Sequence, residues 1–125
     1  MIDLVFTWPP SPLSPNARLH WSKVAKAKKK YRALIFAETL EQLGTRPLQL
    51  SDKMILTMTF VPPDNRSYDR DNLTARMKAG IDGMSDALKI DDKQFHTVIA
   101  TVDKTRVRKG TVLINIKGEN DGEKN

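Results

Sequence analysis

The 125-residue chain contains no cysteine, which excludes disulfide bonds and metal sites built from thiolates. No apolar run approaches the roughly 20 residues of a membrane-spanning helix, and the first residues lack the basic leader and long apolar stretch of a signal peptide. Neither a glycine-rich phosphate loop nor a nucleophilic triad pattern is present, so nucleotide hydrolysis and acyl transfer are poorly supported. We therefore expect a cytoplasmic protein with no membrane partner and no nucleotide cofactor.

Acidic residues are absent from a long N-terminal stretch. No Asp or Glu lies between Leu4 and Ala37, although the whole chain has 15 acidic residues and a net charge of +6. Basic residues gather in that stretch and again near the C-terminal end: Arg18, Lys23, Lys26, Lys28, Lys29, Lys30 and Arg32, then Lys104, Arg106, Arg108 and Lys109. This distribution favours a polyanionic partner, most simply nucleic acid, over the alternative of a solvated helix face.

The length predicts a single domain, residues 1–117, followed by a polar tail over 118–125 that is expected to be disordered. Hydrophobic periodicity and turn residues predict strands at 2–8 and 52–61, helices at 22–43 and 70–88, and a hairpin formed by 94–103 and 111–117. A proline-rich loop or extended arm occupies residues 9–16. The order β-α-β-α-β-β indicates an α+β (mixed α/β) domain whose helices cover one face of a sheet.

Both predicted helices have an apolar stripe that is expected to face the core. The stripes consist of Val24, Ala27, Tyr31, Leu34 and Ile35 in the first helix, capped by Ser22, and of Leu73, Met77, Ile81, Met84 and Leu88 in the second. Gly80 and Gly83 lie inside the second helix, where each costs about 1 kcal/mol relative to alanine. Either the helix is weak there or something packs close to it.

Two acidic steps stand out in this basic chain: Asp69-Arg70-Asp71 and Asp91-Asp92. On an extended backbone, Asp69 and Asp71 would point the same way with α-carbons about 7 Å apart, close enough to reach one metal ion. The alternatives are a helix cap at the first step and a turn at the second. Close carboxylates are costly unless a hard cation such as magnesium bridges them. A basic protein with an acidic metal site fits phosphodiester hydrolysis.

The run Asp69-Arg70-Asp71-Asn72-Leu73, a helix with Lys78 and Asp82, and then Asp91-Asp92-Lys93-Gln94 resembles the RusA family of Holliday junction resolvases. Trp8-Pro9-Pro10-Ser11 is similar to the W-P-P-S that ends the family's first strand, and the resemblance extends from Phe6 to Ile116. It implies a homodimeric, magnesium-dependent endonuclease, with manganese as an alternative ion. The implied reaction is paired symmetric nicking of four-way DNA junctions in recombination and repair.

The resemblance also implies residue roles. Asp69, Asp71 and Asp92 match the family's three magnesium-binding aspartates, and Asp91 is the neighbouring acid. The family has a lysine shortly after D-N-L, where this chain has Ala75. An insertion near Ala75-Arg76-Met77 would bring Lys78 into that catalytic role, with Arg76 as the alternative. The expected DNA contacts are Arg18, Lys23, Lys26, Lys29, Lys30, Arg70, Arg76, Arg106, Arg108 and Lys109.

The spacing of the acids raises a geometric question, because a straight helix from Asp71 to Leu88 would be about 26 Å long. Either the helix ends early near Gly80 and the chain doubles back, or two copies of this helix pack antiparallel across a dimer axis. In the second arrangement the glycines allow close approach, and Asp92 meets Asp69 and Asp71 of the partner. We expect this shared site.

Several residues are given a structural interpretation. Trp8, Tyr31 and Phe95 are expected in the core, while Trp21 is an equal candidate for the core and for a wedge between unstacked bases. His96 falls on an apolar strand face and is expected to be structural. Two other functions stay open: a non-catalytic nucleic-acid-binding protein whose aspartates are caps and turns, and a metal-dependent nuclease of other specificity, such as flap or RNA cleavage.

Overall fold

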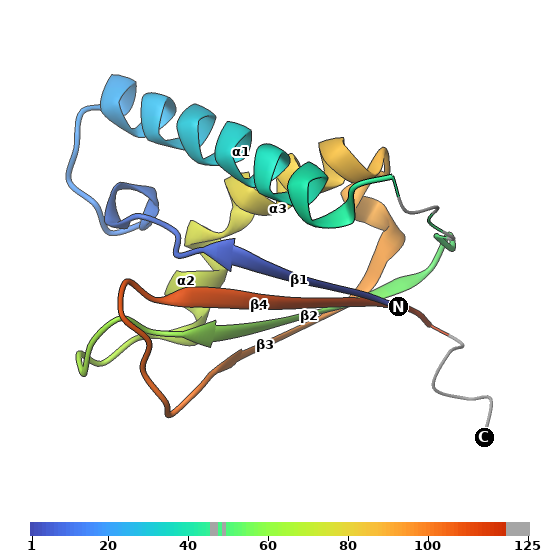
Figure 1. Cartoon of the computed structure of the whole chain (residues 1–125). Coiled ribbons are helices and arrows are strands. Elements are labelled where there is room, and N and C mark those ends of the chain that lie inside the picture. The colour runs from blue at the N-terminus through green and yellow to red at the C-terminus, as the bar shows by residue number, and fades with distance from the viewer. Residues whose placement is uncertain (46–47, 49, 120–125) are drawn as a thin grey trace.

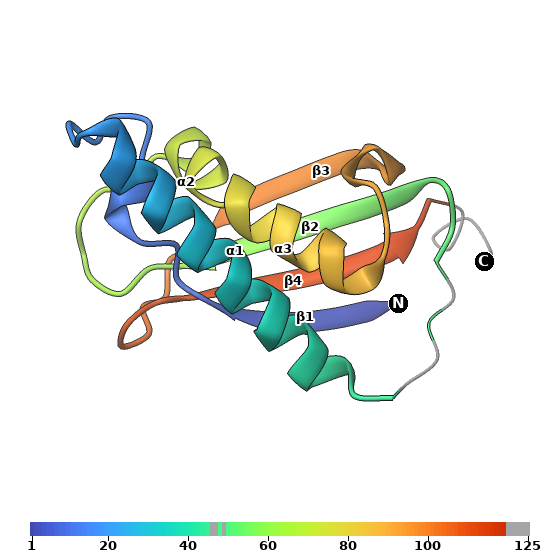
Figure 2. The same cartoon turned by 90° about the horizontal axis from the view of Figure 1, so that it is seen from above.

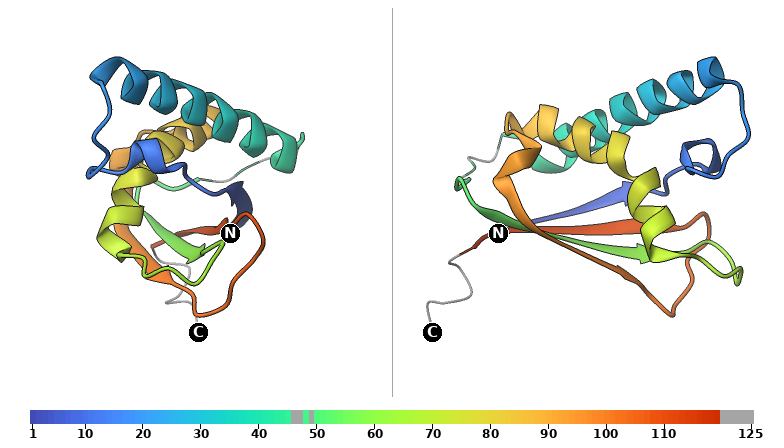
Figure 3. Two further views of the ribbon diagram at one scale, coloured as in Figure 1. Left: turned by 90° about the vertical axis from the view of Figure 1, so that its left-hand side faces the viewer. Right: turned by 180° about the vertical axis from the view of Figure 1, so that it is seen from behind.

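The structure is a computed structural model that describes residues 1–45, 48 and 50–119. Its strands are β1 (Ile2–Thr7), β2 (Met54–Val61), β3 (Phe95–Val102) and β4 (Thr111–Gly118). Its helices are α1 (Trp21–Leu43), α2 (Arg70–Arg76) and α3 (Lys78–Leu88), with short 3-10 helices η1 (Ser11–Leu13) and η2 (Asp92–Gln94). The helices lie over one face of a four-stranded sheet (Figures 1 and 3). The predicted α+β class is confirmed.

The sheet has the strand order β1-β4-β2-β3. Strand β4 is antiparallel to both β1 and β2, whereas β2 and β3 are parallel and are joined through α2 and α3. A parallel pair needs such a crossover connection. Inward-facing residues alternate along the strands and form the core, including Leu4, Leu56, Met58 and Ile114, each at most 2% exposed.

The predicted hairpin of the last two strands is wrong, because β3 and β4 lie on opposite sides of β2. The connection 103–110 crosses the end of β2 instead of forming a tight turn. The Asp103 N–H donates to the Phe60 carbonyl at 2.8 Å, and the Val107 N–H donates to the Pro62 carbonyl at 3.1 Å. Strand periodicity fixes which face of a strand is buried but does not specify the neighbouring strand.

The second predicted helix is divided in two at Met77, so the element order is β-α-β-α-α-β-β. The Met77 N–H donates to the carbonyls of both Leu73 (3.0 Å) and Thr74 (3.2 Å), which marks a tightened last turn of α2. The predicted apolar stripe is otherwise confirmed, since Leu73, Met77, Met84 and Leu88 are buried.

Gly80 and Gly83 are the places where α1 packs against α3. A Cβ at Gly83 would overlap the carbonyl oxygen of Arg32 and lie 3.2 Å from the Phe36 nitrogen. A Cβ at Gly80 would lie 2.7 Å from the Tyr31 ring. Close packing at the glycines is therefore confirmed. Their neighbour is α1 of the same chain, however, so the prediction that they contact a second subunit's helix is wrong.

Helix α1 differs from the prediction at its start and in its buried face. His20, not Ser22, is the N-cap, and its Nδ1 accepts a hydrogen bond from the Ser22 N–H at 3.2 Å. Tyr31 and Ile35 are buried as predicted, but Leu34 is 40% exposed. Only the side of α1 that faces α3 and the sheet is covered, and it is narrower than the predicted stripe. Figure 2 shows α1 running alongside α3 and crossing obliquely above β1.

The chain segments outside the main elements behave mostly as expected. The proline-rich loop is ordered: it contains η1, buries Leu13, and accepts a hydrogen bond from Asn72 Nδ2 on the Ser14 hydroxyl at 2.9 Å. Gly118 belongs to β4 instead of the predicted tail, and residues 120–125 lie outside the described part. Residues 46, 47 and 49, between α1 and β2, also lie outside it. None of the described helices has the length and apolar character to span a bilayer.

Candidate functional site

Asp69 and Asp71 lie at the start of α2. Asp69 is the N-cap, with an extended backbone (φ −84°, ψ 125°), and its Oδ1 accepts a hydrogen bond from the Asp71 N–H at 3.1 Å. Asp71 belongs to the first helical turn and is exposed, with its carboxylate 3.6 Å from the Arg70 guanidinium. The capping interpretation is thus confirmed for Asp69. The extended geometry predicted for the pair is wrong, because Asp71 is already helical.

Lys78, the first residue of α3, joins two carboxylates. Its Nζ lies 2.7 Å from Asp92 Oδ2 and 3.1 Å from Asp82 Oδ1. The hydrogen bond from Lys78 lowers the pKa of Asp92, and the same bond raises the pKa of Lys78. The two shifts agree in describing a charged pair. The ammonium group lies between the Asp82 and Asp92 carboxylates and offsets their mutual repulsion.

A reversal of the chain after α3 brings Asp92 to Lys78. Lys89 adopts the left-handed conformation (φ 59°, ψ 44°), and the Ile90 N–H donates to the Ser85 carbonyl at 3.1 Å. The helix runs through its glycines to Leu88 before the chain turns back, which excludes the alternative that it ends early near Gly80.

Asp91 serves as a cap. Its Oδ1 accepts from the Lys93 N–H at 2.9 Å, and its own N–H donates to Gln94 Oε1 at 2.9 Å, which together form a capping box on η2. The turn interpretation of this acidic step is confirmed for Asp91. Of the Asp91-Asp92 step, only Asp92 directs its carboxylate to Lys78.

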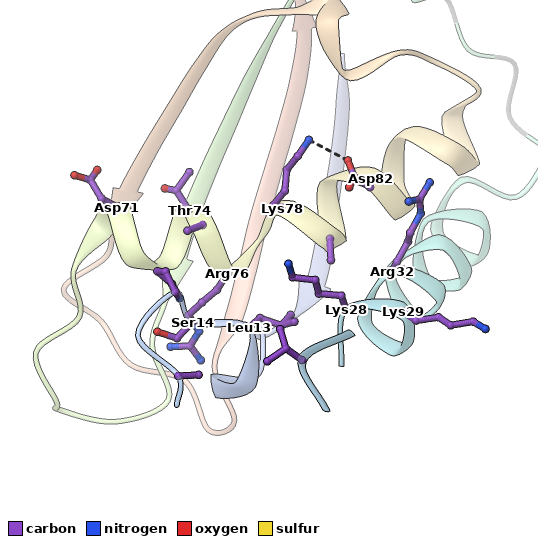
Figure 4. Close-up of a pocket in the computed structure, with 15 residues that line it drawn as sticks. Leu13, Ser14, Lys28, Lys29, Arg32, Asp71, Thr74, Arg76, Lys78 and Asp82 are labelled. Atoms are coloured by element: carbon purple, nitrogen blue, oxygen red, sulfur yellow. Dashed lines mark hydrogen bonds and ion pairs between the residues drawn. The ribbon is translucent and has the colours of Figure 1, made fainter. Parts of the chain in front are cut away.

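A groove of about 980 Å³ lies between α1, the proline-rich loop and the α2–α3 segment. Its lining combines apolar residues, such as Leu13 and Val24, with both signs of charge: Lys28, Lys29, Arg32, Lys78, Asp71 and Asp82. Figure 4 shows Asp71, Thr74 and Lys78 projecting from the same side of α2 and α3. The groove therefore places cations that suit phosphates beside carboxylates that suit a divalent metal ion.

Arg76 has a structural position that the sequence did not predict. It is 9% exposed, its Nη2 donates to the Pro9 carbonyl at 2.6 Å, and its guanidinium lies 5.9 Å from the Trp8 ring. Burial lowers its pKa. The prediction that Arg76 contacts DNA or the scissile phosphate is therefore wrong, because its charged group is directed inward to tie α2 to the end of β1.

The other predicted DNA-contacting residues are exposed: Arg18, Lys23, Lys26, Lys29, Lys30, Arg70, Arg106, Arg108 and Lys109. They belong to three places, the N-terminal half of α1 with the loop before it, the start of α2, and the connection 103–110. Arg106 is braced there by donating to the Asp103 and Thr105 carbonyls, both at 2.9 Å.

The aromatic predictions are largely confirmed. The Trp8 ring makes edge-to-face contacts with the rings of Phe60 and Tyr68, with centroids 6.1 and 5.5 Å apart. Tyr31 is 2% exposed and Phe95 is 9% exposed. Trp21 is 75% exposed, so it is a surface residue. His96 is exposed as well, 3.6 Å from Glu119, and the prediction of a structural role on an apolar face is wrong because β3 is an edge strand.

Two groove residues and one ion pair were not predicted from the sequence. Arg32 makes a two-pronged contact with Asp86, at 2.8 and 3.0 Å, which links α1 to α3. Lys28 lines the groove. Asp82 was noted only as part of the motif, although its i,i+4 spacing from Lys78 is a recognised signal for a helical ion pair.

The three aspartates of the motif do not meet in one chain. Among the described residues, no three His, Asp or Glu side chains gather in a way that could hold a metal ion. The oxygen ligands are chemically suited to magnesium but form two groups, Asp69 with Asp71 at the start of α2 and Asp92 with Asp82 around Lys78. A complete three-aspartate site needs these two groups to be brought together.

Two comparisons with known proteins bear on this chain. No protein-family model matches it. An uncharacterized protein from Xylella fastidiosa (strain Temecula1) is 39% identical over 121 residues, which cover 94% of this chain and 77% of the relative. Identity at this level over nearly the whole chain means that the two share a fold and an ancestor. The chain belongs to the same protein family as this Xylella fastidiosa protein.

Proposed function

We propose that the protein is a magnesium-dependent endonuclease of the RusA type that resolves four-way DNA junctions. The observation that carries this proposal is a groove whose lining combines Asp71 and Asp82 with Lys28, Lys29 and Lys78. Cations alone would indicate a binding surface, and carboxylates alone would repel a polyanion. Their combination suits hydrolysis of a phosphodiester that is held by its own phosphates.

Asp69, Asp71 and Asp92 would hold the magnesium ion, with manganese as an alternative, and the ion would activate a water and offset charge on the scissile phosphate. Lys78 keeps Asp92 ionised through their 2.7 Å contact. The Lys78 ammonium would contact the phosphate or the leaving oxygen. The exposed lysines of α1 position the DNA backbone without reading its sequence.

Two chains act together in this proposal. A four-way junction has approximate two-fold symmetry, and its resolution needs two symmetric nicks. Each chain supplies one set of motif aspartates, so a homodimer supplies the two sites.

A non-catalytic nucleic-acid-binding protein is the second candidate, and one observation favours it. Asp69 and Asp91 both act as caps, which explains their presence without a metal ion. Such a protein would bind DNA with strong salt dependence and would not need magnesium. The groove does not distinguish junctions from flaps or RNA, so a nuclease of other specificity is tested in the same assay.

The test compares a synthetic four-way junction, a linear duplex and a single strand, each with magnesium, manganese or chelator. We expect paired symmetric nicks in the junction alone, dependent on the metal ion. Asp71→Asn should bind the junction and fail to cut it, whereas Asp52→Asn, in an exposed turn before β2, should cut normally. Metal-independent binding without nicks would support the second candidate, and cleavage of flaps or RNA would redirect the substrate assignment.

A further inference from the structure

Trp21, the first residue of α1, is far more exposed than is usual for tryptophan. It is 75% exposed, whereas Trp8, the other tryptophan of the chain, packs against Phe60 and Tyr68. Large aromatic side chains are mostly buried, because contact of their apolar surface with water is unfavourable. One exposed apolar side chain does not by itself indicate a binding site. The neighbouring ring, the place in the fold and the surrounding charge of Trp21 together do.

The His20 ring lies beside the indole of Trp21. The two ring centroids are 5.4 Å apart and the ring planes are inclined by 34°. His20 is itself held by capping α1, since its Nδ1 accepts from the Ser22 N–H at 3.2 Å and lies 2.8 Å from the Ser22 hydroxyl. The indole therefore has a fixed neighbour that restricts its rotation, while three quarters of the residue stay open. A ring that is already restricted loses little conformational entropy when a ligand stacks on it.

Trp21 lies on the face of α1 that lines the groove. Because a helix turns about 100° per residue, residues three, seven and eleven positions after Trp21 return to within about 60° of its direction. These residues are Val24, Lys28 and Arg32, and all three line the groove. Figures 1 and 2 show the start of α1 at the same end of the molecule as α2. The indole is thus placed at the end of the groove, where α1 begins.

The charge around Trp21 is positive. Arg18 and Lys23 flank it in the sequence and are exposed, and no Asp or Glu lies between Leu4 and Ala37. Exposed cations bind phosphates without regard to sequence, and an aromatic ring among them offers a surface on which a base can stack. An apolar patch on a partner protein would match the indole but not the cations. A nucleobase with its flanking phosphates matches both.

We propose that Trp21 is a stacking site for an unpaired nucleobase whose flanking phosphates are bound by Arg18, Lys23 and Lys28. Within a duplex, neighbouring base pairs cover both faces of each base, so only an unstacked base offers a free face. The site therefore favours strands with such a base, at a branch point, a gap or a bulge, and does so for any base, since each has an aromatic face. The inference rests on the nucleic-acid binding of the proposed function and not on its metal chemistry.

The first test compares two duplexes that differ at one position. One contains a single unpaired thymine, and the other has an abasic residue in its place; chelator is present so that binding is measured without cleavage. We expect the wild type to bind the unpaired thymine about 10-fold more tightly, which is the size of effect that one stacked base produces. Trp21→Ala should bind both duplexes equally. Equal binding by the wild type, or a preference that survives in Trp21→Ala, would overturn the inference.

Matched variants separate stacking from a change in the fold. Trp21→Tyr retains an aromatic ring and should keep the preference to within about three-fold. Leu40→Ala removes a 46% exposed apolar side chain from the other half of α1 and should leave the preference unchanged. All variants should bind a fully paired duplex as the wild type does, because the cations that hold it are intact. Loss of the preference in Trp21→Tyr or in Leu40→Ala would contradict stacking on the indole.

The second test observes the indole directly. Because Trp8 is packed between Phe60 and Tyr68, Trp21 supplies the exposed tryptophan fluorescence. A short single-stranded oligothymidine should quench this fluorescence in the wild type and not in Trp21→Phe. Quenching of the same size in Trp21→Phe, or none in the wild type at saturating oligonucleotide, would exclude contact between a base and Trp21.

The stacking site and the proposed nuclease fail separately. A preference for the unpaired base that depends on Trp21, in a protein that makes no nicks in the four-way junction, would refute the nuclease and keep the stacking site. Metal-dependent nicking without this preference would keep the nuclease and refute the stacking site. A protein that binds none of these DNA molecules would refute both.

Discussion

Gly83→Ala offers a sharp test of the way α1 and α3 pack. Alanine has the higher helix propensity, by about 1 kcal/mol, so an exposed helix would gain stability from this change. At Gly83, however, the new Cβ would overlap the Arg32 carbonyl oxygen and lie 3.1 Å from the Arg32 carbonyl carbon. The obstacle is the backbone of a 23-residue helix, which cannot rotate away as a side chain can.

The net cost follows from two opposing effects. Overpacking in a core costs roughly 1–3 kcal/mol, and a clash with backbone belongs at the upper end of that range. Subtracting the propensity gain leaves a destabilisation of about 2 kcal/mol. With a urea m-value of about 1.5 kcal/mol/M, the unfolding midpoint should fall by more than ~1 M.

Gly80→Ala is the matched control in the same helix. Its Cβ would lie 2.7 Å from a ring carbon of Tyr31 and 3.0 Å from the terminal methyl group of Met77, both of which are side-chain atoms that can move. Its cost belongs at the lower end of the range, so the propensity gain nearly cancels it. The test measures the urea unfolding curves of both variants and the wild type at the same protein concentration. If Gly83→Ala equals or exceeds the wild type in stability, the close approach of α1 at this position is incorrect.

Three further predictions concern charges. Lys78→Met removes the hydrogen bond that lowers the Asp92 pKa, so NMR titration should show that pKa rising to the ordinary range of an aspartate. Because the Asp92 pKa is lowered in the folded state, the pair stabilises the wild type above the ordinary aspartate pKa. This contribution is lost on acidification and is missing from the variant. Arg76→Leu should lower the free energy of unfolding in urea by about 2 kcal/mol and leave the salt dependence of DNA affinity unchanged. Lys29→Gln, in contrast, should lower the slope of log affinity against log salt concentration by about 1. A changed slope in Arg76→Leu would show that Arg76 contacts a phosphate after all. Burial raises the pKa of Tyr31 and of Tyr68, so both phenol groups stay protonated in the folded protein, which loses stability above about pH 10. A tyrosine with an ordinary pKa in absorbance titration would contradict the burial of these side chains.

The fold could be predicted from the sequence where the physics is local. Alternation of apolar residues located all four strands, because a half-buried strand repeats every two residues. Alternation did not predict which strands lie beside β4, because strand pairing depends on the path of the connection 103–110 over the end of β2. The break at Met77 was also missed, because the apolar stripe continues through it without interruption.

The same distinction between local and long-range features applies to the candidate site. Capping by Asp69 and Asp91 follows from nearby sequence and was anticipated as an alternative. The burial of Arg76 was not predicted, because its hydrogen-bond partner, the Pro9 carbonyl, is distant in sequence. The contact of Lys78 with Asp92 depends on the reversal at Lys89, a left-handed residue that is not glycine and that gives no sequence signal.

The spacing between Asp71 and Lys78 bears on the proposed role of Lys78. An α-helix turns about 100° per residue, so residues four and seven positions after Asp71 both return to nearly the same side. Ala75 and Lys78 accordingly line the same groove as Asp71. The insertion that the resemblance implies near residues 75–77, if about three residues long, would therefore advance a lysine by about one turn without moving it to another face. The added length still displaces the rest of the helix by about 4.5 Å, and the break at Met77 lets α3 take its own direction against α1. The proposed role of Lys78 therefore requires no change of helix face, and the break at Met77 lies within the segment where the resemblance implies an insertion.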